Sequence, residues 1–468
     1  MAEVKAEEKK SRFVLPHIYV LLFGVIVVCA VLTWILPAGE FDRVTNATGQ
    51  KLVVPGTFHL VEGNPVGIFG MFKCIYDGLC NAAPVTMFTF VAYAFIGLII
   101  GTGAFDGLVA GLLKVFKGKT KVAIIPIFIT LIGFASSTIG VFEETFPFIP
   151  IFVGISIALG YDAIVGMAIV SLAAAIGYSG AFMNPFTVGT AQSIAGLPIM
   201  SGAGYRIFCH LCMIVVASIY TIRYALKIEK DPTKSLVYGD PNDFAINRAD
   251  VEQHRFGIRE KLVLLVLATG IGILVYGTKT YGWYFKELSA LFMIMGLLSA
   301  VIIGWSPNEI ARRLTKSFED IAMACMMIGF ARGVLMVMQQ GKVIDTFVYG
   351  MSLPLASLPP VLSAECMLLV QTLLNFLIPS GSGQAVVSMP IMAPLADLRH
   401  LPRQLAVLCF QYGDGLSNIL WPTAFAPVCS AIAGVKVNKW WQWFIPLFLL
   451  LLLTQMGTVA LALIIGWQ

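Results

Sequence analysis

Long apolar runs separated by short polar segments fill most of this chain. The first run, at 15–36, is too long for the core of a signal peptide, so it predicts a spanning helix that is retained. Several later runs are too short to cross about 30 Å of hydrocarbon at 1.5 Å per residue, and they predict half-helices. The later runs are 83–113, 122–135, 144–160, 163–182, 186–200, 203–226, 262–278, 288–305, 318–339, 358–378, 384–396, 404–416, 419–434 and 442–466.

Composition limits the class of protein. Hydrophobic residues make up 58% of the chain and charged residues 12%, whereas soluble proteins carry about 25% charged residues. A secreted enzyme, a nucleic-acid-binding module and a disordered protein are therefore excluded. The apolar runs are continuous rather than alternating, which excludes a β-barrel. We expect an all-α polytopic membrane protein without metal or catalytic residues.

The basic residues predict the orientation of the spans. With the N-terminus in the cytoplasm, the segments 114–121, 223–261, 306–317 and 435–441 are cytoplasmic as well. Together with the N-terminus they hold 21 of the 31 lysines and arginines, and nine lie on the other side. Positive charge concentrates on the cytoplasmic side of membrane proteins. We therefore expect a multi-pass protein of a bacterial inner membrane with a cytoplasmic N-terminus.

Two pairs of short runs predict re-entrant hairpins. The first pair, 122–135 and 144–160, enters from the cytoplasm with its tip at 136–144. The second pair, 358–378 and 384–396, enters from the outside with its tip at 380–383. Each hairpin precedes a crossing that is interrupted, near Asn184-Pro185 in the first half and near 418–422 in the second.

Matching residues in the two halves predict an inverted repeat. Ser137 precedes Pro147 by ten residues, as Ser380 precedes Pro390, and Tyr178 and Tyr412 each precede an Asn by six. In the same order, Gly97, Gly103 and Asp106 of the first half correspond to Gly333, Gly341 and Asp345 of the second half. Inverted repeats with broken helices are typical of secondary transporters.

The repeat divides the chain into three expected parts. The first repeat covers 1–226, with scaffold helices at 14–113, a hairpin and broken helix at 122–200, and a helix at 203–226. A cytoplasmic linker follows at 227–261. The third part, 262–468, holds an extra helix and the second repeat, with a hairpin at 358–396, a broken helix at 404–434 and a helix at 442–466.

The interruptions predict the binding site. Non-helical backbone at membrane depth is tolerated where it is buried or lines a wet cavity, and half-helix ends offer free N–H and C=O groups. We therefore expect the two tips and the two breaks to meet near the middle of the membrane. The candidate substrate-binding residues are Ser137, Thr138, Glu143, Glu144, Asn184, Thr187, Ser380, Gly381, Ser382, Gly383, Gln384, Asp414, Asn418 and Thr423.

Few ionisable residues lie deep in the predicted spans. Glu143 and Glu144 follow the first tip and Asp414 precedes the second break, so they are candidates for a cation or proton site. The alternative is that they cap helix starts or form a salt bridge. Arg332 is the one basic residue deep in a span. It either binds a substrate carboxylate or pairs with Asp320 or Asp345.

Four segments carry a family resemblance: PSGSGQAVVSMPIMAPLADL at 379–398, QYGDGLSNILWPT at 411–423, GFARGVLMVMQQGKVIDT at 329–346 and ASSTIGVFEETFPFIPI at 135–151. They closely resemble the YfcC-type branch of the anaerobic C4-dicarboxylate carrier-like family, which includes arginine/ornithine antiporter-like proteins. The resemblance implies the ion-transporter superfamily fold, a dimer of scaffold domains, and a hairpin-bearing transport domain that moves as an elevator. The Ser-Asn-Thr sodium signature of that superfamily is only partial around Asn418.

The expected function is secondary active transport of a small amino acid. Acids outnumber bases among the candidate residues, which favours a basic substrate such as arginine or ornithine, by exchange or by proton- or sodium-coupled uptake. The alternative is a C4-dicarboxylate or another small carboxylate. A remote alternative is an intramembrane protease built on Asp162 and Asp414 or on Ser382 and His210. We expect the protein to lie in a lipid bilayer, to bind a small-molecule substrate and to form a homodimer through its scaffold. We expect no cofactor beyond a coupling proton or sodium ion.

Overall fold

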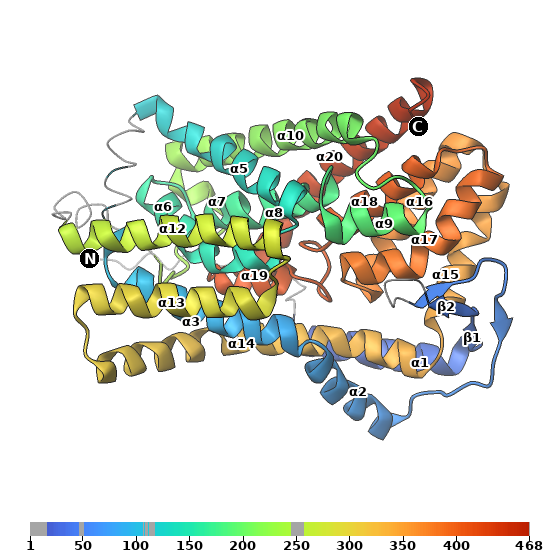
Figure 1. The fold of residues 1–468 in the computed structure, drawn as a ribbon, viewed down its shortest axis with the longest axis horizontal. Coiled ribbons are helices and arrows are strands. Elements are labelled where there is room, and N and C mark those ends of the chain that lie inside the picture. The colour runs from blue at the N-terminus through green and yellow to red at the C-terminus, as the bar shows by residue number, and fades with distance from the viewer. Residues whose placement is uncertain are drawn as a thin grey trace, which may run out of the picture.

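A computed structural model describes residues 16–45, 51–105, 107, 111, 118–244 and 257–467. In these ranges the chain is mostly helical, and nine helices are long and apolar enough, by length and composition, to cross a membrane. Figure 1 shows the long helices α3, α12, α13 and α14 running along the longest axis of the molecule. The expectation of an all-α polytopic membrane protein is confirmed.

The first half contains helices, two small sheets and short 3-10 or π segments. Its elements are α1 (Ile18–Ile35), β1 (Gly39–Glu40), β2 (Arg43–Thr45), β3 (Lys51–Val53), β4 (His59–Leu60), α2 (Ile68–Asn81), α3 (Ala83–Gly101), η1 (Gly118–Ala123), α5 (Ile124–Ile139), η2 (Glu143–Phe148), α6 (Ile149–Ala158), α7 (Ala163–Met167), η3 (Ala168–Leu172), α8 (Ala173–Ser179), η4 (Pro185–Gly189), α9 (Thr190–Ile194), α10 (Ala203–Lys230) and η5 (Pro232–Lys234).

All elements of the second half are helices, joined by short turns and by the interruption at 418–425, within its described residues. Its elements are α12 (Ile258–Tyr281), α13 (Phe285–Ile303), α14 (Pro307–Gln340), α15 (Ile344–Ser352), η6 (Pro354–Ser357), α16 (Pro360–Leu377), α17 (Gly381–Leu398), α18 (Arg403–Ser417), α19 (Ala426–Ile432) and α20 (Val437–Ile464).

These helices pack as two groups. In the scaffold group (α1–α3 and α12–α14), α14 packs against α1, α2 and α3, and α13 packs against α3 and α12. In the hairpin group (α5–α10 and α16–α20), α18 packs against α8, α16, α17 and α20. The groups meet where α14 contacts α19 and where α3 contacts η2. The start of η2 is the first hairpin tip, so this tip lies against the scaffold group.

Both predicted hairpins reverse direction as expected. Phe128 of α5 and Phe152 of α6 have ring centroids 4.8 Å apart, so the chain turns back after 140–142 and brings α6 beside α5 at these rings. The open end of this hairpin is closed by Lys121, whose Nζ donates to the carbonyl of Leu159 at 2.9 Å. In the second hairpin Arg399 donates to the carbonyl of Leu358 in the same way.

The two halves make corresponding contacts. α5 packs on α8 as α16 packs on α18, and α6 packs on α7 as α17 packs on α18. The closing helices match as well, because α10 contacts α5 and α8 as α20 contacts α16 and α18. In Figure 1 the hairpin α5–α6 reaches the centre from the left half and α16–α17 from the right half. The same order of hairpin, broken helix and closing helix therefore recurs with opposite direction.

Glycine allows the scaffold helices to touch backbone to backbone. A Cβ added at Gly78 of α2 would lie 2.5 Å from the backbone nitrogen of Gly333 and 2.7 Å from the carbonyl oxygen of Gly329, both in α14. A Cβ at Gly97 of α3 would lie 2.5 Å from the side-chain Oγ of Ser317 in α14, so this contact is between backbone and side chain. These glycines thus serve contacts within one chain, while the homodimer stays a prediction.

Some elements differ from the apolar runs. The run 318–339 is the second part of α14, which begins at Pro307, and α3 ends at Gly101 although its run continues to 113. Asp106, matched above with Asp345, lies outside the described residues. α2 and the small sheets were not expected, because their sequences mix polar and apolar residues without a clear period.

The small sheets follow α1 in the chain and contact α15 through β1 and α17 through β3. β1 pairs with β4 and β2 with β3, both antiparallel. Arg43 of β2 donates to both carboxylate oxygens of Asp345 at 2.8 Å, and Phe41 N–H donates to Oδ2 at 3.0 Å. Asp345 therefore anchors this sheet. All nine cysteines are free, including the buried Cys74 and the exposed Cys80.

Candidate functional site

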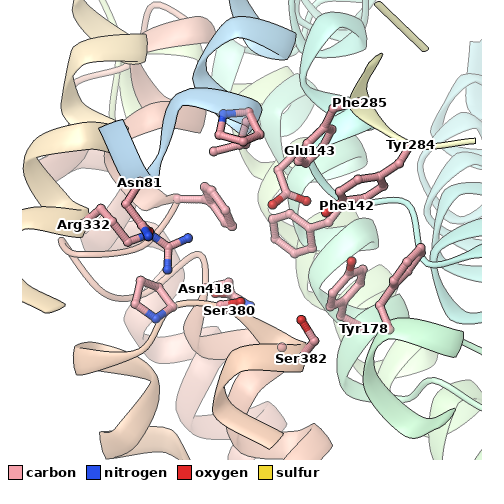
Figure 2. Close-up of a pocket in the computed structure, with 16 residues that line it drawn as sticks. Asn81, Phe142, Glu143, Tyr178, Tyr284, Phe285, Arg332, Ser380, Ser382 and Asn418 are labelled. Atoms are coloured by element: carbon pink, nitrogen blue, oxygen red, sulfur yellow. The ribbon is translucent and has the colours of Figure 1, made fainter. Parts of the chain in front are cut away.

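One cavity of about 160 Å³ lies where both hairpin tips, the second helix break and the scaffold group meet. Figure 2 shows its side chains converging from these elements. The volume suits a small metabolite better than a drug-sized ligand, whose pocket is typically several hundred Å³. The lining residues are Asn81, Pro84, Val85, Phe142, Glu143, Tyr178, Phe186, Tyr284, Phe285, Arg332, Pro379, Ser380, Gly381, Ser382, Asn418 and Phe425.

The two adjacent glutamates of the first tip, Glu143 and Glu144, have different surroundings. α5 ends at Gly140, whose φ of +84° is the left-handed conformation that glycine adopts without strain. The hydroxyl of Tyr178 donates to the Gly140 carbonyl at 2.9 Å and fixes this turn. Glu144 folds back to accept the N–H of Phe142 at 2.9 Å and is buried. Glu143 lines the cavity.

The second tip approaches both broken helices. Ser380 caps α17 by accepting the N–H of Gly383 at 3.4 Å. A Cβ added at Gly381 would lie 2.8 Å from Cγ2 of Thr187 and 3.1 Å from Oδ2 of Asp414. Only a residue without a side chain allows this approach. The tip therefore joins the first break, through Thr187, to the second, through Asp414.

A buried amide network surrounds Asp414. Asn375 Nδ2 donates to Asp414 Oδ1 at 3.0 Å and to Asn418 Oδ1 at 3.4 Å, and Asn418 Nδ2 donates to the carbonyl of Asp414 at 2.8 Å. Three buried oxygens here have no hydrogen-bond partner among the described residues: Asp414 Oδ2, Thr187 Oγ1 and Asn375 Oδ1. Buried polar atoms are normally paired, so these three oxygens on neighbouring segments are exceptions to that rule.

Other predicted site residues stabilise the interruptions and do not line the cavity. Asn184 Oδ1 accepts the N–H groups of Phe186 at 2.8 Å and Thr187 at 3.3 Å, which caps the second part of the broken helix. Ser137 and Thr138 donate to the carbonyl of Phe134 within α5. In the second half, Gln384 donates to Gln371 and Thr423 to the carbonyl of Phe376.

The scaffold group contributes lining residues that were not among the predicted substrate-binding residues. Arg332 lines the cavity from α14, and Asn81 and Tyr284 lie at the adjoining ends of α2 and α13. Neither expected partner of Arg332 is available, because Asp345 pairs with Arg43 and Asp320 pairs with Lys316 at 2.8 Å. Figure 2 shows Arg332 and Glu143 pointing into the cavity from different sides.

Aromatic rings complete the walls. The rings of Phe142 and Phe425 lie 5.3 Å apart, and Phe142 and Tyr178 lie 5.1 Å apart edge to face. Phe186 of the hairpin group meets Tyr284 of the scaffold group at 5.5 Å. Phe142 and Phe425 flank the tip and the break that were predicted to meet. Their exact neighbours depend on tertiary packing that the sequence pattern does not contain.

Asp162 and His210, which the protease alternatives would pair with Asp414 and Ser382, lie away from the cavity. Asp162 caps α7 by accepting the N–H of Val165, and it also accepts the hydroxyls of Tyr224 at 2.6 Å and Ser235 at 2.7 Å. Its carboxylate is thus used structurally. His210 of α10 packs against Phe182 and does not line the cavity that contains Ser382. No group of three or more His, Cys, Asp or Glu residues in the described ranges could hold a metal ion.

Comparisons with known proteins agree over nearly the whole chain. Residues 15–464 match the model of the DcuC family, the C4-dicarboxylate anaerobic carriers. A relative from Escherichia coli K12 is 30% identical over 94% of both chains and carries the name "Putative basic amino acid antiporter YfcC". An uncharacterized protein of Haemophilus influenzae is 29% identical over 96% of this chain and 97% of its own.

Two solved membrane transporters align along the chain at low similarity. The YdaH transporter of Alcanivorax borkumensis has a TM-score of 0.44 at 16% identity, covering 97% of this chain and 99% of its own. MtrF of Neisseria gonorrhoeae has a TM-score of 0.43 at 13% identity, covering 95% and 94%.

Proposed function

The chain is a membrane transporter that belongs to the DcuC family of C4-dicarboxylate anaerobic carriers, and from this premise we propose that its substrate is a small basic amino acid. We infer secondary active transport by exchange or by cation-coupled uptake across a bacterial inner membrane, with the N-terminus in the cytoplasm. The hairpin group acts as the transport domain and moves against a scaffold that forms a homodimer.

The charge around the cavity carries this proposal. Glu143 is the acid of the lining and Arg332 its one basic residue, whereas Glu144 and Asp414 lie outside the lining. A carboxylate and a guanidinium in one cavity favour a ligand that carries both a cationic group and a carboxylate, through electrostatic complementarity. The printed name of the E. coli relative, a basic amino acid antiporter, supports the same substrate class.

A C4-dicarboxylate is the second candidate, and the family name favours it. Arg332 and the N-terminus of α17, which begins at Gly381 beside Ser380, would attract its carboxylates. The second carboxylate would then share the cavity of about 160 Å³ with Glu143, and like charges at that range repel. The basic substrate therefore remains the better fit.

A ligand panel tests the substrate class. We expect arginine, ornithine or lysine to raise the melting temperature of the purified protein, since a ligand that binds only the folded state stabilises it. Glu143→Gln keeps the shape of the tip and removes one charge, so affinity for the basic amino acid should fall at least about tenfold, ~1.4 kcal/mol. Stabilisation by succinate or fumarate, with no response to basic amino acids, would replace the proposal by the dicarboxylate candidate.

The unpaired oxygens around Asp414 support a separate coupling site for a proton or a sodium ion. Asp414 Oδ2, Thr187 Oγ1 and Asn375 Oδ1 are buried without partners among the described residues, and a cation or an added proton would satisfy them. The site lies behind Gly381, so its occupancy would set how closely the second tip packs.

Substitution of Asp414 tests this coupling. We expect ligand affinity to depend on sodium concentration or on pH between 5.5 and 8 in the wild type, and Asp414→Asn to abolish that dependence because no charge remains to compensate. Asp397→Asn is the matched control, because Asp397 is half exposed and paired with Arg403. An unchanged cation dependence in Asp414→Asn would place the coupling elsewhere.

A further inference from the structure

We propose that Arg332 binds the α-carboxylate of the transported amino acid, so that the substrate bridges the scaffold group and the hairpin group. This inference rests on the proposed function, because it concerns how a basic amino acid is held in the same cavity. It adds a discrimination that Glu143 alone cannot give: an amino acid is accepted and the corresponding amine without a carboxylate is rejected.

Arg332 is half-buried and has no carboxylate partner among the described residues. It lies in the C-terminal third of α14, and no acidic oxygen of the described residues lies within the 4.0 Å of an ion pair. The two candidates from the sequence, Asp345 and Asp320, are paired with Arg43 and Lys316. A guanidinium removed from water without an anion is costly, so the cavity is expected to supply one.

Arg332 and Glu143 face the same cavity without forming an ion pair. Both residues line it, and Figure 2 shows their charged groups entering from different sides. The space between them is part of a volume of about 160 Å³. A ligand that satisfies both groups must carry a carboxylate and a cationic group at separate positions, as an arginine or ornithine molecule does.

The chemistry of the guanidinium fits this role. Its planar fork matches a carboxylate with two parallel hydrogen bonds, which a lysine ammonium cannot reproduce. Asn81 at the end of α2 lines the cavity as well and adds amide donors on the scaffold side. The hairpin group contributes Glu143 for the cationic side chain. Each end of the substrate therefore contacts a different helix group.

The alternative role of Arg332 is to neutralise Glu143 in the empty protein. In that case Arg332→Gln would unmask Glu143, and both arginine and its decarboxylated analogue agmatine would bind more tightly. If Arg332 instead holds the carboxylate, the substitution weakens arginine and leaves agmatine unchanged. The pair of ligands separates the two roles.

The experiment compares the affinities of arginine and agmatine in the purified full chain. We expect the wild type to prefer arginine at least about tenfold, and Arg332→Gln to reduce the preference to within about threefold, chiefly by weakening arginine. Arg332→Lys keeps the charge but not the fork, so it should recover part of the preference. Lys316→Gln removes one positive charge from the exposed part of the same helix and is the matched control.

Each outcome of the affinity comparison supports or overturns a stated proposal. Equal arginine preference in the wild type and in Arg332→Gln overturns the inference while the proposed function stands, and so does tighter binding of both ligands. A wild type that binds no basic amino acid overturns the proposed function and this inference with it. Variants are compared only after their ligand-free melting temperatures show that they fold.

Discussion

The two adjacent glutamates of the first tip have different surroundings. Glu144 is buried with its carboxylate on the N–H of Phe142, whereas Glu143 lines the cavity. The sequence placed both acids at the tip, because acids following an interruption stand out at membrane depth. It could not assign their directions, which depend on the turn at Gly140 and on the 3-10 geometry of η2.

This difference predicts different effects of the two Glu→Gln substitutions. Glu144→Gln weakens the buried hydrogen bond from the N–H of Phe142 and should cost about 1–3 kcal/mol of stability, while substrate affinity changes less than threefold. Thermal unfolding and a binding titration of the same sample check both parts. Substrate affinity lost in Glu144→Gln as strongly as in Glu143→Gln would mean that Glu144 also serves the ligand.

Arg332 illustrates the limit of prediction at single residues. Its position as the one basic residue deep in a span was evident, but Asp320 and Asp345 offered equally good partners. The choice became clear only from the neighbouring elements, since Arg43 of β2 takes Asp345 and Lys316 of α14 takes Asp320. Asn81 and Tyr284 gave no signal at all, because helix packing alone brings them to the cavity.

At the level of elements, apolar run length predicted the hairpins better than the helix ends. The expected hairpin 358–396 corresponds to α16 and α17, and the expected break near Asn184 is the cap of η4. The run 83–113 overestimated α3, which stops at Gly101. Hydrophobicity identifies what is buried, whereas a helix stops where its capping bonds and neighbours allow.

The contact between α2 and α14 predicts a stability defect for one glycine. Gly78→Leu would force a side chain against the backbone of Gly333, so the two helices must separate and the scaffold group should lose several kcal/mol of stability. Gly67→Leu, at the start of α2 with open space around it, is the control. Melting temperature and yield of folded protein provide the measurement. A Gly78→Leu protein as stable as the control would contradict the backbone contact.

For the whole molecule, the charge of Glu143 in the hairpin group predicts that exchange is faster than return of the empty transport domain. An empty transport domain would carry the uncompensated Glu143 past the apolar scaffold, and a buried unpaired charge costs several kcal/mol. A bound cation removes that cost. We therefore expect uptake of labelled arginine to be at least about tenfold faster into proteoliposomes that contain unlabelled arginine than into empty ones.

Glu143→Gln should reduce the difference in uptake rate between loaded and empty proteoliposomes, because the empty transport domain then carries one charge less. The control is Asp397→Asn, which removes an acid at the surface. Equal rates of uptake into loaded and empty vesicles in the wild type would show that the empty domain crosses freely and that charge does not enforce exchange.

The exposed thiol of Cys80 offers a built-in chemical reporter for this molecule. Cys80 is the exposed cysteine of the nine, and it directly precedes Asn81, which lines the cavity from the scaffold side. Labelling of intact cells with a membrane-impermeant maleimide, compared between the wild type and Cys80→Ser, would test whether this thiol faces the external solution. A fluorophore attached at the same atom would then register each arrival of ligand as a change in its emission.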